Sequence, residues 1–261
     1  MIVPTCNRER LLRETLESVE RQTFPDFECL VADDGSTDGT RDVVEGFTRR
    51  DARFRHLPLA HCGKHGRVRN LALGEARAPL VAFLDDDDLW LPETLGTQVA
   101  ALETEQATAL VFGQMERFGA AHGVWPRRVP AALDLPRLLR GNVIALSTVL
   151  ARLEALLGAG LFPEDVEATP DYELWLRVAR LGPIRGLPRV LCRYRVHAGN
   201  MSRRKALELD ELESLYARLQ AEWSLPDSLL SAARRGIERG RARLAATPLE
   251  ALRHRLRAVT R

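Results

Sequence analysis

The sequence predicts an α/β protein whose mostly parallel central sheet is flanked by helices and followed by a helical C-terminal extension. Two observations support this fold class. From residue 1 to residue 115, short apolar segments typical of strands alternate with helical patterns, and such alternation is typical of a parallel sheet covered by helices on both faces. From residue 206 onward, apolar residues recur only at helical spacing, which indicates helices without further strands.

The first half of the chain supplies the alternating elements. Leu12, Leu16 and Val19 follow the 3.6-residue period of an amphipathic helix. The β-rich run 27–32 begins after the turn residues Pro25-Asp26, which separate it from that helix. We expect strands near residues 1–4, 27–32, 53–58, 80–84 and 109–115, and helices near residues 8–22, 38–49, 65–77 and 92–104.

The alternation stops after residue 116. We expect an irregular loop at 119–130, because Gly, Pro and Arg are frequent there. Beyond it, the pattern predicts strands near 143–150 and 189–196, helices near 133–140, 152–158 and 171–181, and only helices from residue 206. The chain is therefore expected to have three parts, residues 1–116, 117–205 and 206–261.

The composition is that of an ordinary globular protein, with 261 residues, 45% hydrophobic residues and a net charge of +2. No segment approaches the roughly 20 apolar residues of a membrane span, and Met1-Ile2-Val3 is too short for a signal-peptide core. These observations predict a cytoplasmic protein. The cysteines stand singly, with no C-x-x-C pair, which predicts neither disulfides nor a zinc site; they are Cys6, Cys29, Cys62 and Cys192.

Four consecutive aspartates, Asp85 to Asp88, directly follow the apolar run 80–84. Adjacent carboxylates repel one another unless a cation or water separates them. Hard oxygen ligands suit Mg²⁺ or Mn²⁺, and such ions keep positions open for substrate phosphates. The alternative is an acidic loop that only caps the next helix.

Polar residues gather after three of the predicted strands. They are the segments 4–8, 33–36 and 85–88. In an open α/β sheet, ligands bind outside the carboxyl ends of the strands, so these segments are expected to form one pocket for a nucleotide whose phosphates reach a metal. Asp33 or Asp34 can accept the imide N–H of a uracil or thymine ring, although a turn and helix cap would use the same residue types.

Several ordered motifs resemble one known family. MIVPTCNR, QTFPDFECLVADDGSTDGT, GRVRNLALG, FLDDDDLWLPETL, PDYELWLR and YRVHAGNMS are similar in order and spacing to the family-two inverting glycosyltransferases over about the first 200 residues. The resemblance implies a GT-A fold and a bacterial enzyme of polysaccharide or glycolipid assembly. Residues 1–116 would form the Rossmann-like nucleotide-sugar-binding half, 117–205 the acceptor-binding and catalytic half, and 206–261 the helical extension.

The resemblance also implies an activity and a set of donor-site residues. The expected reaction is the metal-dependent, inverting transfer of a sugar from a nucleoside diphosphate donor, with UDP favoured, to a hydroxyl of a saccharide or lipid-linked acceptor. Asp85 and Asp87 align with the acidic positions of the DXD element, with Asp86 in the variable place, and Asp87 is the first candidate for the metal. The remaining donor-site candidates are Pro4, Thr5, Arg8, Asp33, Asp34, Arg69 and Asn70.

Asp171 matches the catalytic aspartate of the family, which would take the proton of the acceptor hydroxyl. Its alternative role is an N-cap for the helix that follows. Pro170 stands where the family commonly has Glu, and Glu173 is the second candidate for the base. His197 matches a position from which a histidine can approach the metal, although a lone histidine can also simply end a strand.

Two other classes of function compete with the enzyme. A non-catalytic sugar-nucleotide-binding module would most easily show a lost DXD element or a missing base, and this chain retains both candidates. The arginine-rich tail could bind a nucleic acid or an anionic membrane surface. No nucleic acid is expected, whereas the apolar stripe Leu249, Leu252, Leu256 and Val259 predicts either peripheral contact with the inner face of the membrane or a helix packed on the catalytic part.

Overall fold

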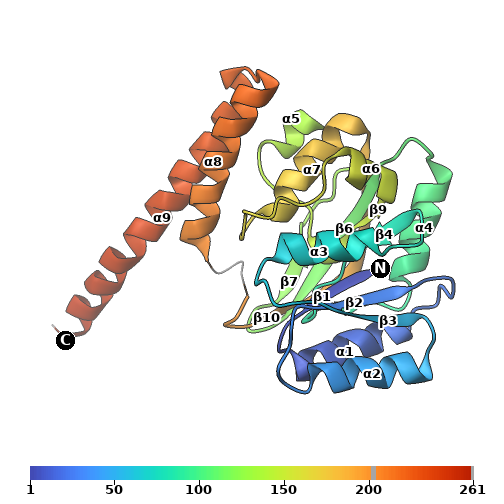
Figure 1. Ribbon diagram of the computed structural model, residues 1–261. Coiled ribbons are helices and arrows are strands. Elements are labelled where there is room, and N and C mark those ends of the chain that lie inside the picture. Colours follow the sequence, from blue (N-terminus) through green and yellow to red (C-terminus); the bar gives the residue numbers. More distant parts are fainter. Residues whose placement is uncertain (201–203, 260–261) are drawn as a thin grey trace.

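The computed structural model describes residues 1–200 and 204–259, and the side chains of residues 1–200 and 204–244. The N-terminal part is a parallel sheet in the order β1-β2-β3, formed by β1 (Ile2–Thr5), β2 (Cys29–Asp33) and β3 (Phe54–Pro58). Helices α1 (Glu9–Glu20) and α2 (Thr40–Arg50) lie on one face of this sheet, and α3 (His65–Gly74) lies on the other (Figure 1).

Alternation along the strands explains why helices cover both faces. Val3 and Val31 pack in one hydrophobic cluster with Leu16 of α1. Ile2 and Leu30, their neighbours along the strands, pack in a second cluster with residues of α3. Because successive side chains of a strand point to opposite faces, each strand is buried on both sides.

A second, mixed sheet continues from the first. Its order is β4-β9-β6-β10-β5, with β7 beside β6 and β8 beside β10. The strands are β4 (Leu80–Ala82), β5 (Leu89–Trp90), β6 (Leu110–Gly119), β7 (Gly123–Trp125), β8 (Ala132–Leu133), β9 (Leu150–Arg152) and β10 (Ile184–Val196). Only β6 and β10 pair in parallel here, and a parallel bridge from Ile2 to Phe83 links the two sheets.

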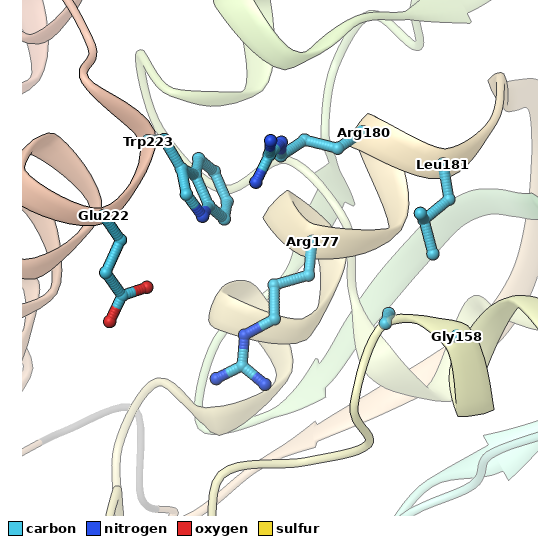
Figure 2. Close-up of a pocket in the computed structure, with 7 residues that line it drawn as sticks. Gly158, Arg177, Arg180, Leu181, Glu222 and Trp223 are labelled. Atoms are coloured by element: carbon cyan, nitrogen blue, oxygen red, sulfur yellow. The ribbon is translucent and has the colours of Figure 1, made fainter.

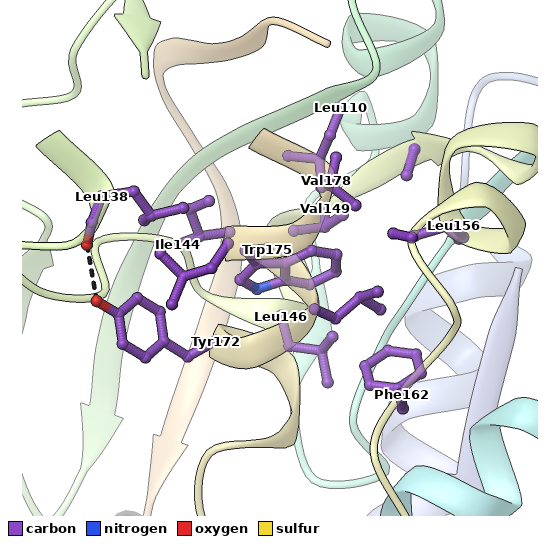
Figure 3. Close-up of a cluster of buried hydrophobic side chains, with 14 of the residues drawn as sticks. Leu110, Leu138, Ile144, Leu146, Val149, Leu156, Phe162, Tyr172, Trp175 and Val178 are labelled. Carbon is purple, nitrogen blue, oxygen red and sulfur yellow. Dashed lines mark hydrogen bonds between the residues drawn. The ribbon is translucent and has the colours of Figure 1, made fainter. Parts of the chain in front are cut away.

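Helix α7 (Pro170–Leu181) packs in the centre of the second half. Its first turn contains Pro170, whose fixed φ suits that position. Trp175 is fully buried in a cluster with Phe162 and with apolar residues of β6 and β9, and the Tyr172 hydroxyl donates to the main-chain oxygen of Leu138 at 2.7 Å (Figure 3). The helices α5 (Leu135–Leu138), η1 (Leu146–Thr148, a 3-10 helix) and α6 (Leu153–Gly158) pack in the same cluster as α7. Helix α4 (Thr94–Thr104) packs through Leu95 and Leu102 in the other cluster.

Two long helices follow the sheet. Helices α8 (Lys205–Trp223) and α9 (Asp227–Val259) lie side by side as a hairpin, and the end of α9 extends away from the rest of the chain (Figure 1). The predicted apolar stripe Leu249, Leu252, Leu256 and Val259 lies outside the described side chains. Within the described ranges, no helix combines the length and apolar character that crossing a bilayer requires.

Two predicted elements differ from the observed ones. The predicted strand at 143–150 is wrong, because this segment contains η1 and β9 begins only at Leu150. The Thr148 hydroxyl donates to the main-chain oxygen of Ala145, three residues before it, at 2.8 Å, so a local hydrogen bond competes with a strand ladder here. The predicted loop 119–130 contains the short strand β7, which pairs with β6.

Candidate active site

The acidic run forms the turn between β4 and β5. Its last member, Asp88, is fully buried and accepts hydrogen bonds from the Ser147 hydroxyl at 2.7 Å and from the Arg195 main-chain N–H at 3.0 Å. Burial, followed by the charges of Asp85 and Asp87, raises the pKa of Asp88 well above its usual range. Asp88 therefore anchors the turn to η1 and β10.

Asp87 lies next to a histidine from the end of β10. Its Oδ2 is 2.8 Å from His197 Nε2, while Nδ1 of the same ring accepts the Gly199 N–H at 3.0 Å. Because Nδ1 is an acceptor, Nε2 carries the proton directed at Asp87. Burial and then the charge of Asp85 raise the pKa of Asp87, so the two carboxylates face the same space and repel each other.

Asp85 is paired with Arg69 of α3. The guanidinium Nη2 donates to Asp85 Oδ1 at 2.7 Å, and Arg69 is only 6% exposed. Its Nε is buried without a hydrogen-bond partner among the described residues. A buried donor of this kind is costly as long as it lacks a partner, and an anion could satisfy this N–H only if neighbouring groups moved aside.

Asp86, Thr5 and Arg8 border the same space. Burial raises the pKa of Asp86 to about 7. The positive charge of Arg8 acts in the opposite direction on the pKa of both Asp86 and Asp87, which places its guanidinium near the acidic turn. The Thr5 hydroxyl is buried at the end of β1, beyond Pro4, and lies close enough to the Asp86 carboxyl group to lower its pKa.

Asp33 and Asp34 lie at the end of β2. Asp33 Oδ1 accepts hydrogen bonds from the Ser36 N–H at 2.9 Å and from its hydroxyl at 2.5 Å. Asp34 accepts the main-chain N–H groups of Cys62 and Gly63, both at 2.8 Å. Both carboxylates thus stabilise the turns around them through hydrogen bonds. Recognition of the nucleotide base by either residue stays a prediction.

Asn70 differs from its predicted role. Its side-chain amide donates to the main-chain oxygen of Phe162 at 2.9 Å and accepts the N–H of the same residue at 3.0 Å. It also donates to Glu164 at 3.2 Å. Asn70 therefore fastens the loop after α6 to α3, and a contact with a donor would require these hydrogen bonds to break.

Asp171 lies in the first turn of α7, while the N-cap position is occupied by Thr169. The capping alternative for Asp171 is therefore wrong. The pKa of Asp171 is raised to about 6, mainly by burial and in smaller part by the charge of Asp85. The Tyr172 N–H and the Arg69 charge act to lower this pKa. The carboxyl group of α7 thus shares one electrostatic environment with the Arg69–Asp85 pair.

Glu173 does not suit the role of a second base. It is 1% exposed and forms ion pairs with Arg177 of its own helix and with Arg218 of α8. A carboxylate held between two guanidinium groups is stabilised in its charged form and is occupied. Glu173 therefore joins α7 to α8.

The residues around the acidic turn fit a hard divalent cation in part. Two neighbouring carboxylates, Asp85 and Asp87, provide the oxygen ligands that Mg²⁺ and Mn²⁺ prefer, and a cation would relieve the repulsion that raises the pKa of Asp87. The predicted set of three ligands is not preassembled, because Asp85, Asp87 and His197 do not form a group of ligand atoms within 4.8 Å in the described part of the chain. Two carboxylates plus water and phosphate oxygens would be sufficient for Mg²⁺.

A cavity of about 320 Å³ lies elsewhere (Figure 2). It is bounded by α6, by the C-terminal half of α7 and by the end of α8, where Arg180 stacks over the Trp223 ring at 4.5 Å. It contains none of the side chains predicted to bind a donor or a metal. This cavity is therefore separate from the acidic turn.

Comparison with known proteins decides the family. Residues 1–150 match the family described as Glycosyl transferase family 2. The chain belongs to glycosyltransferase family 2. It is 30% identical over 211 residues, covering 80% of this chain and 81% of the relative, to the UDP-Glc:alpha-D-GlcNAc-diphosphoundecaprenol beta-1,3-glucosyltransferase WfaP of Escherichia coli.

Solved structures share the fold. S. aureus TarS 1–349 in complex with UDP-GlcNAc has a TM-score of 0.69 at 24% identity, covering 82% of this chain and 65% of that one. The TarS complex with UDP has a TM-score of 0.65 at 25% identity, covering 80% and 64%. The mannosyltransferase PcManGT from Pyrobaculum calidifontis, in complex with GDP-Man and Mn²⁺, has a TM-score of 0.68 at 22% identity, covering 99% and 79%. The predicted GT-A fold is thus confirmed.

The predicted enzyme class is likewise confirmed, since this glycosyltransferase family 2 chain matches named glycosyltransferases. Sequence reasoning missed Arg195, whose Nε donates to the main-chain oxygen of Asp87 at 2.9 Å and whose Nη2 pairs with Glu14. It also missed Glu211 of α8, which accepts three main-chain N–H groups just before Asp171. Arg195 lies within the motif YRVHAGNMS, where attention fell on His197, whereas Glu211 lies outside every motif, so no local signal marks it.

Proposed function

We propose that this chain catalyses the metal-dependent, inverting transfer of a sugar from a UDP-sugar to a hydroxyl group of a lipid-linked saccharide, with release of UDP. The printed name of WfaP describes a UDP-glucose donor and a diphosphoundecaprenol-linked acceptor, and TarS binds UDP. The observation that carries the proposal is the shared environment of Asp171, Arg69 and Asp85, because both of the latter act on the pKa of Asp171.

Inversion requires a base and a leaving-group site on opposite sides of the sugar. The Asp171 carboxylate would take the proton of the acceptor hydroxyl as its oxygen bonds to the anomeric carbon and the bond to the diphosphate breaks. Arg69, whose guanidinium already pairs with Asp85, would pair with the departing diphosphate. When bound at Asp85 and Asp87, Mn²⁺ or Mg²⁺ would supply charge stabilisation to the same leaving group.

The experiment is a transfer assay with UDP-sugars and a diphosphoundecaprenol-linked saccharide, followed by NMR of the new glycosidic linkage. We expect UDP release that requires a divalent ion and a product with inverted anomeric configuration. Asp171→Asn should lose turnover, while Asp165→Asn, a matched change at an exposed aspartate of the preceding loop, should keep it. A retained configuration, or full turnover in Asp171→Asn, would contradict the proposal.

A further inference from the structure

Three potential metal ligands from separate segments lie together beside the turn after β2. Cys6 follows β1, Asp34 follows β2, and His61 lies in the loop between β3 and α3. One ligand atom of each residue, the sulfur, a carboxylate oxygen and a ring nitrogen, lies within 4.8 Å of the other two. Among the residues that the structure describes, no other group of three histidine, cysteine or acidic side chains meets this criterion.

The distances between these atoms are close to those around a tetrahedral zinc ion. His61 Nδ1 is 3.8 Å from Cys6 Sγ and 3.2 Å from Asp34 Oδ2. Zinc–ligand bonds of about 2.0 to 2.3 Å at tetrahedral angles separate nitrogen from sulfur by roughly 3.6 Å and nitrogen from oxygen by roughly 3.3 Å. A small movement of the Cys6 side chain would be sufficient to place all three atoms on one ion.

The surrounding main chain holds two of the ligands in place. The Asp34 carboxylate is fixed by the N–H groups of Cys62 and Gly63, which follow His61 directly. Gly35 has a φ of 70°, and a Cβ at this position would lie 2.8 Å from the His61 Cβ. Only glycine permits this close approach, so the loop that carries His61 is packed against the end of β2.

We infer that Cys6, Asp34 and His61 form a binding site for a thiophilic divalent cation, with Zn²⁺ as the expected ion. A thiolate and an imidazole favour Zn²⁺ or Co²⁺ over Mg²⁺ and Mn²⁺, so this site differs in selectivity from the carboxylates of the acidic turn. In the structure His61 Nδ1–H donates to the main-chain oxygen of Asp34 at 2.9 Å, because a carbonyl oxygen can only accept. On binding, this proton is released to solvent and Nε2 takes one up, so that Nδ1 is free to coordinate, and Cys6 becomes a thiolate and releases its proton to solvent. Water or the main-chain oxygen of Asp34 completes the tetrahedron.

Occupation of this site would oppose nucleotide binding, a consequence that rests on the proposed function. Asp34 is one of the two candidates to accept the imide N–H of the base. An ion on its carboxylate takes an oxygen lone pair and adds positive charge where that N–H would donate. Zn²⁺ at this position is therefore an inhibitor of donor binding.

The site is tested by titrating the full chain with Co²⁺ in excess Mg²⁺ and without nucleotide. We expect a thiolate-to-cobalt charge-transfer absorption that saturates at one equivalent. Cys6→Ser should abolish this absorption. His61→Ala, at a side chain that is 63% exposed and can be removed without disturbing the core, should weaken cobalt binding at least tenfold. Cys62→Ser is the matched control and should keep the absorption.

No absorption in the wild-type protein, or absorption that survives Cys6→Ser and disappears in Cys62→Ser, would overturn the site. The antagonism is tested by measuring UDP affinity with and without one equivalent of Zn²⁺. We expect at least a tenfold loss in the wild type and none in Cys6→Ser, and an unchanged wild-type affinity would overturn the antagonism. A chain that binds cobalt through Cys6 but never binds UDP would contradict the proposed function and leave the metal site intact.

Discussion

His197 Nε2 lies 2.8 Å from Asp87 Oδ2, so the histidine that follows β10 donates a hydrogen bond to the second acid of the predicted DXD element. Its other ring nitrogen accepts the Gly199 N–H. In this arrangement His197 would orient the carboxylate proposed to bind the metal, and direct coordination would require a change of tautomer. Both roles predict that the ring supports metal binding.

We predict that His197→Ala raises the half-saturating Mn²⁺ concentration of the transfer reaction by about 10- to 100-fold, since partners that orient a ligand have effects of this size. The measurement is the initial rate as a function of Mn²⁺ at saturating donor. His122→Ala removes a histidine from an exposed position and should leave the curve unchanged. Identical Mn²⁺ curves for His197→Ala and the wild type would exclude both roles.

Arg69→Lys tests the planar guanidinium beside Asp85. Lysine keeps the charge but loses the fork that can pair with Asp85 and with a phosphate at the same time. We predict a rise of about tenfold in KM for the UDP-sugar, corresponding to about 1.4 kcal/mol. Arg67→Lys is the matched control on the same helix, at an exposed side chain, and an equal effect of both substitutions would argue against a specific site at Arg69.

Asp171→Asn should lower kcat by about 10²- to 10⁴-fold, the usual contribution of a general base. Because the pKa of Asp171 is about 6 and a base must be ionised, kcat/KM of the wild type should fall as the pH decreases through about 6. The residual activity of Asp171→Asn should lack this acid limb. A variant that keeps the acid limb would assign it to another group.

Ionisation of the Asp171 carboxyl group should increase activity but decrease the stability of the fold. Its pKa in the folded state is raised above the usual 3.8, so the folded protein holds this proton more tightly and stability falls as the pH rises from about 4 to about 6. At pH 7 the neutral amide of Asp171→Asn avoids this cost, and we predict that its free energy of unfolding is higher by roughly 1 to 3 kcal/mol. Denaturant unfolding at pH 4 and pH 7 measures the difference, which should vanish at pH 4.

Much of the N-terminal half could be predicted because its signals are local. Leu12, Leu16 and Val19 all lie on the buried side of α1, as their spacing indicates. The run of aspartates follows β4 directly, and strand ends of this kind are read from neighbouring residues alone. The spacing of apolar residues therefore predicted the main helices and strands of this half. It also predicted the positions of three segments near the site, 4–8, 33–36 and 85–88.

Contacts between distant segments could not be predicted. Asn70 bonds to Phe162, 92 residues away, and its type alone suited a donor contact equally well. The apolar residues near Ile144 and Leu146 suggested a strand. Both residues are buried in the core, but neither belongs to a strand. Partners of this kind are chosen by tertiary packing, which overrides local preference.

Glu211 is the clearest case of such a contact and supports the last prediction. Its Oε1 accepts the Glu167 N–H at 2.8 Å, and its Oε2 accepts the N–H groups of Ala168 and Thr169 at 2.8 and 2.9 Å. The α8 carboxylate thus fixes the loop that leads into α7 two residues before Asp171. Gln at this position would turn an NH₂ group toward part-buried N–H donors, which leaves at least one of them unpaired.

We therefore predict that Glu211→Gln lowers the free energy of unfolding by about 1 to 3 kcal/mol and lowers kcat with little change in the KM for the donor, because only the position of Asp171 is disturbed. Glu213→Gln is the matched control, since Glu213 is 61% exposed and pairs with Arg241 at the surface, where an ion pair contributes about 0 to 1 kcal/mol. Unfolding curves and steady-state kinetics measure both effects. Equal stability losses in the two variants would show that the loop does not depend on the Glu211 carboxylate.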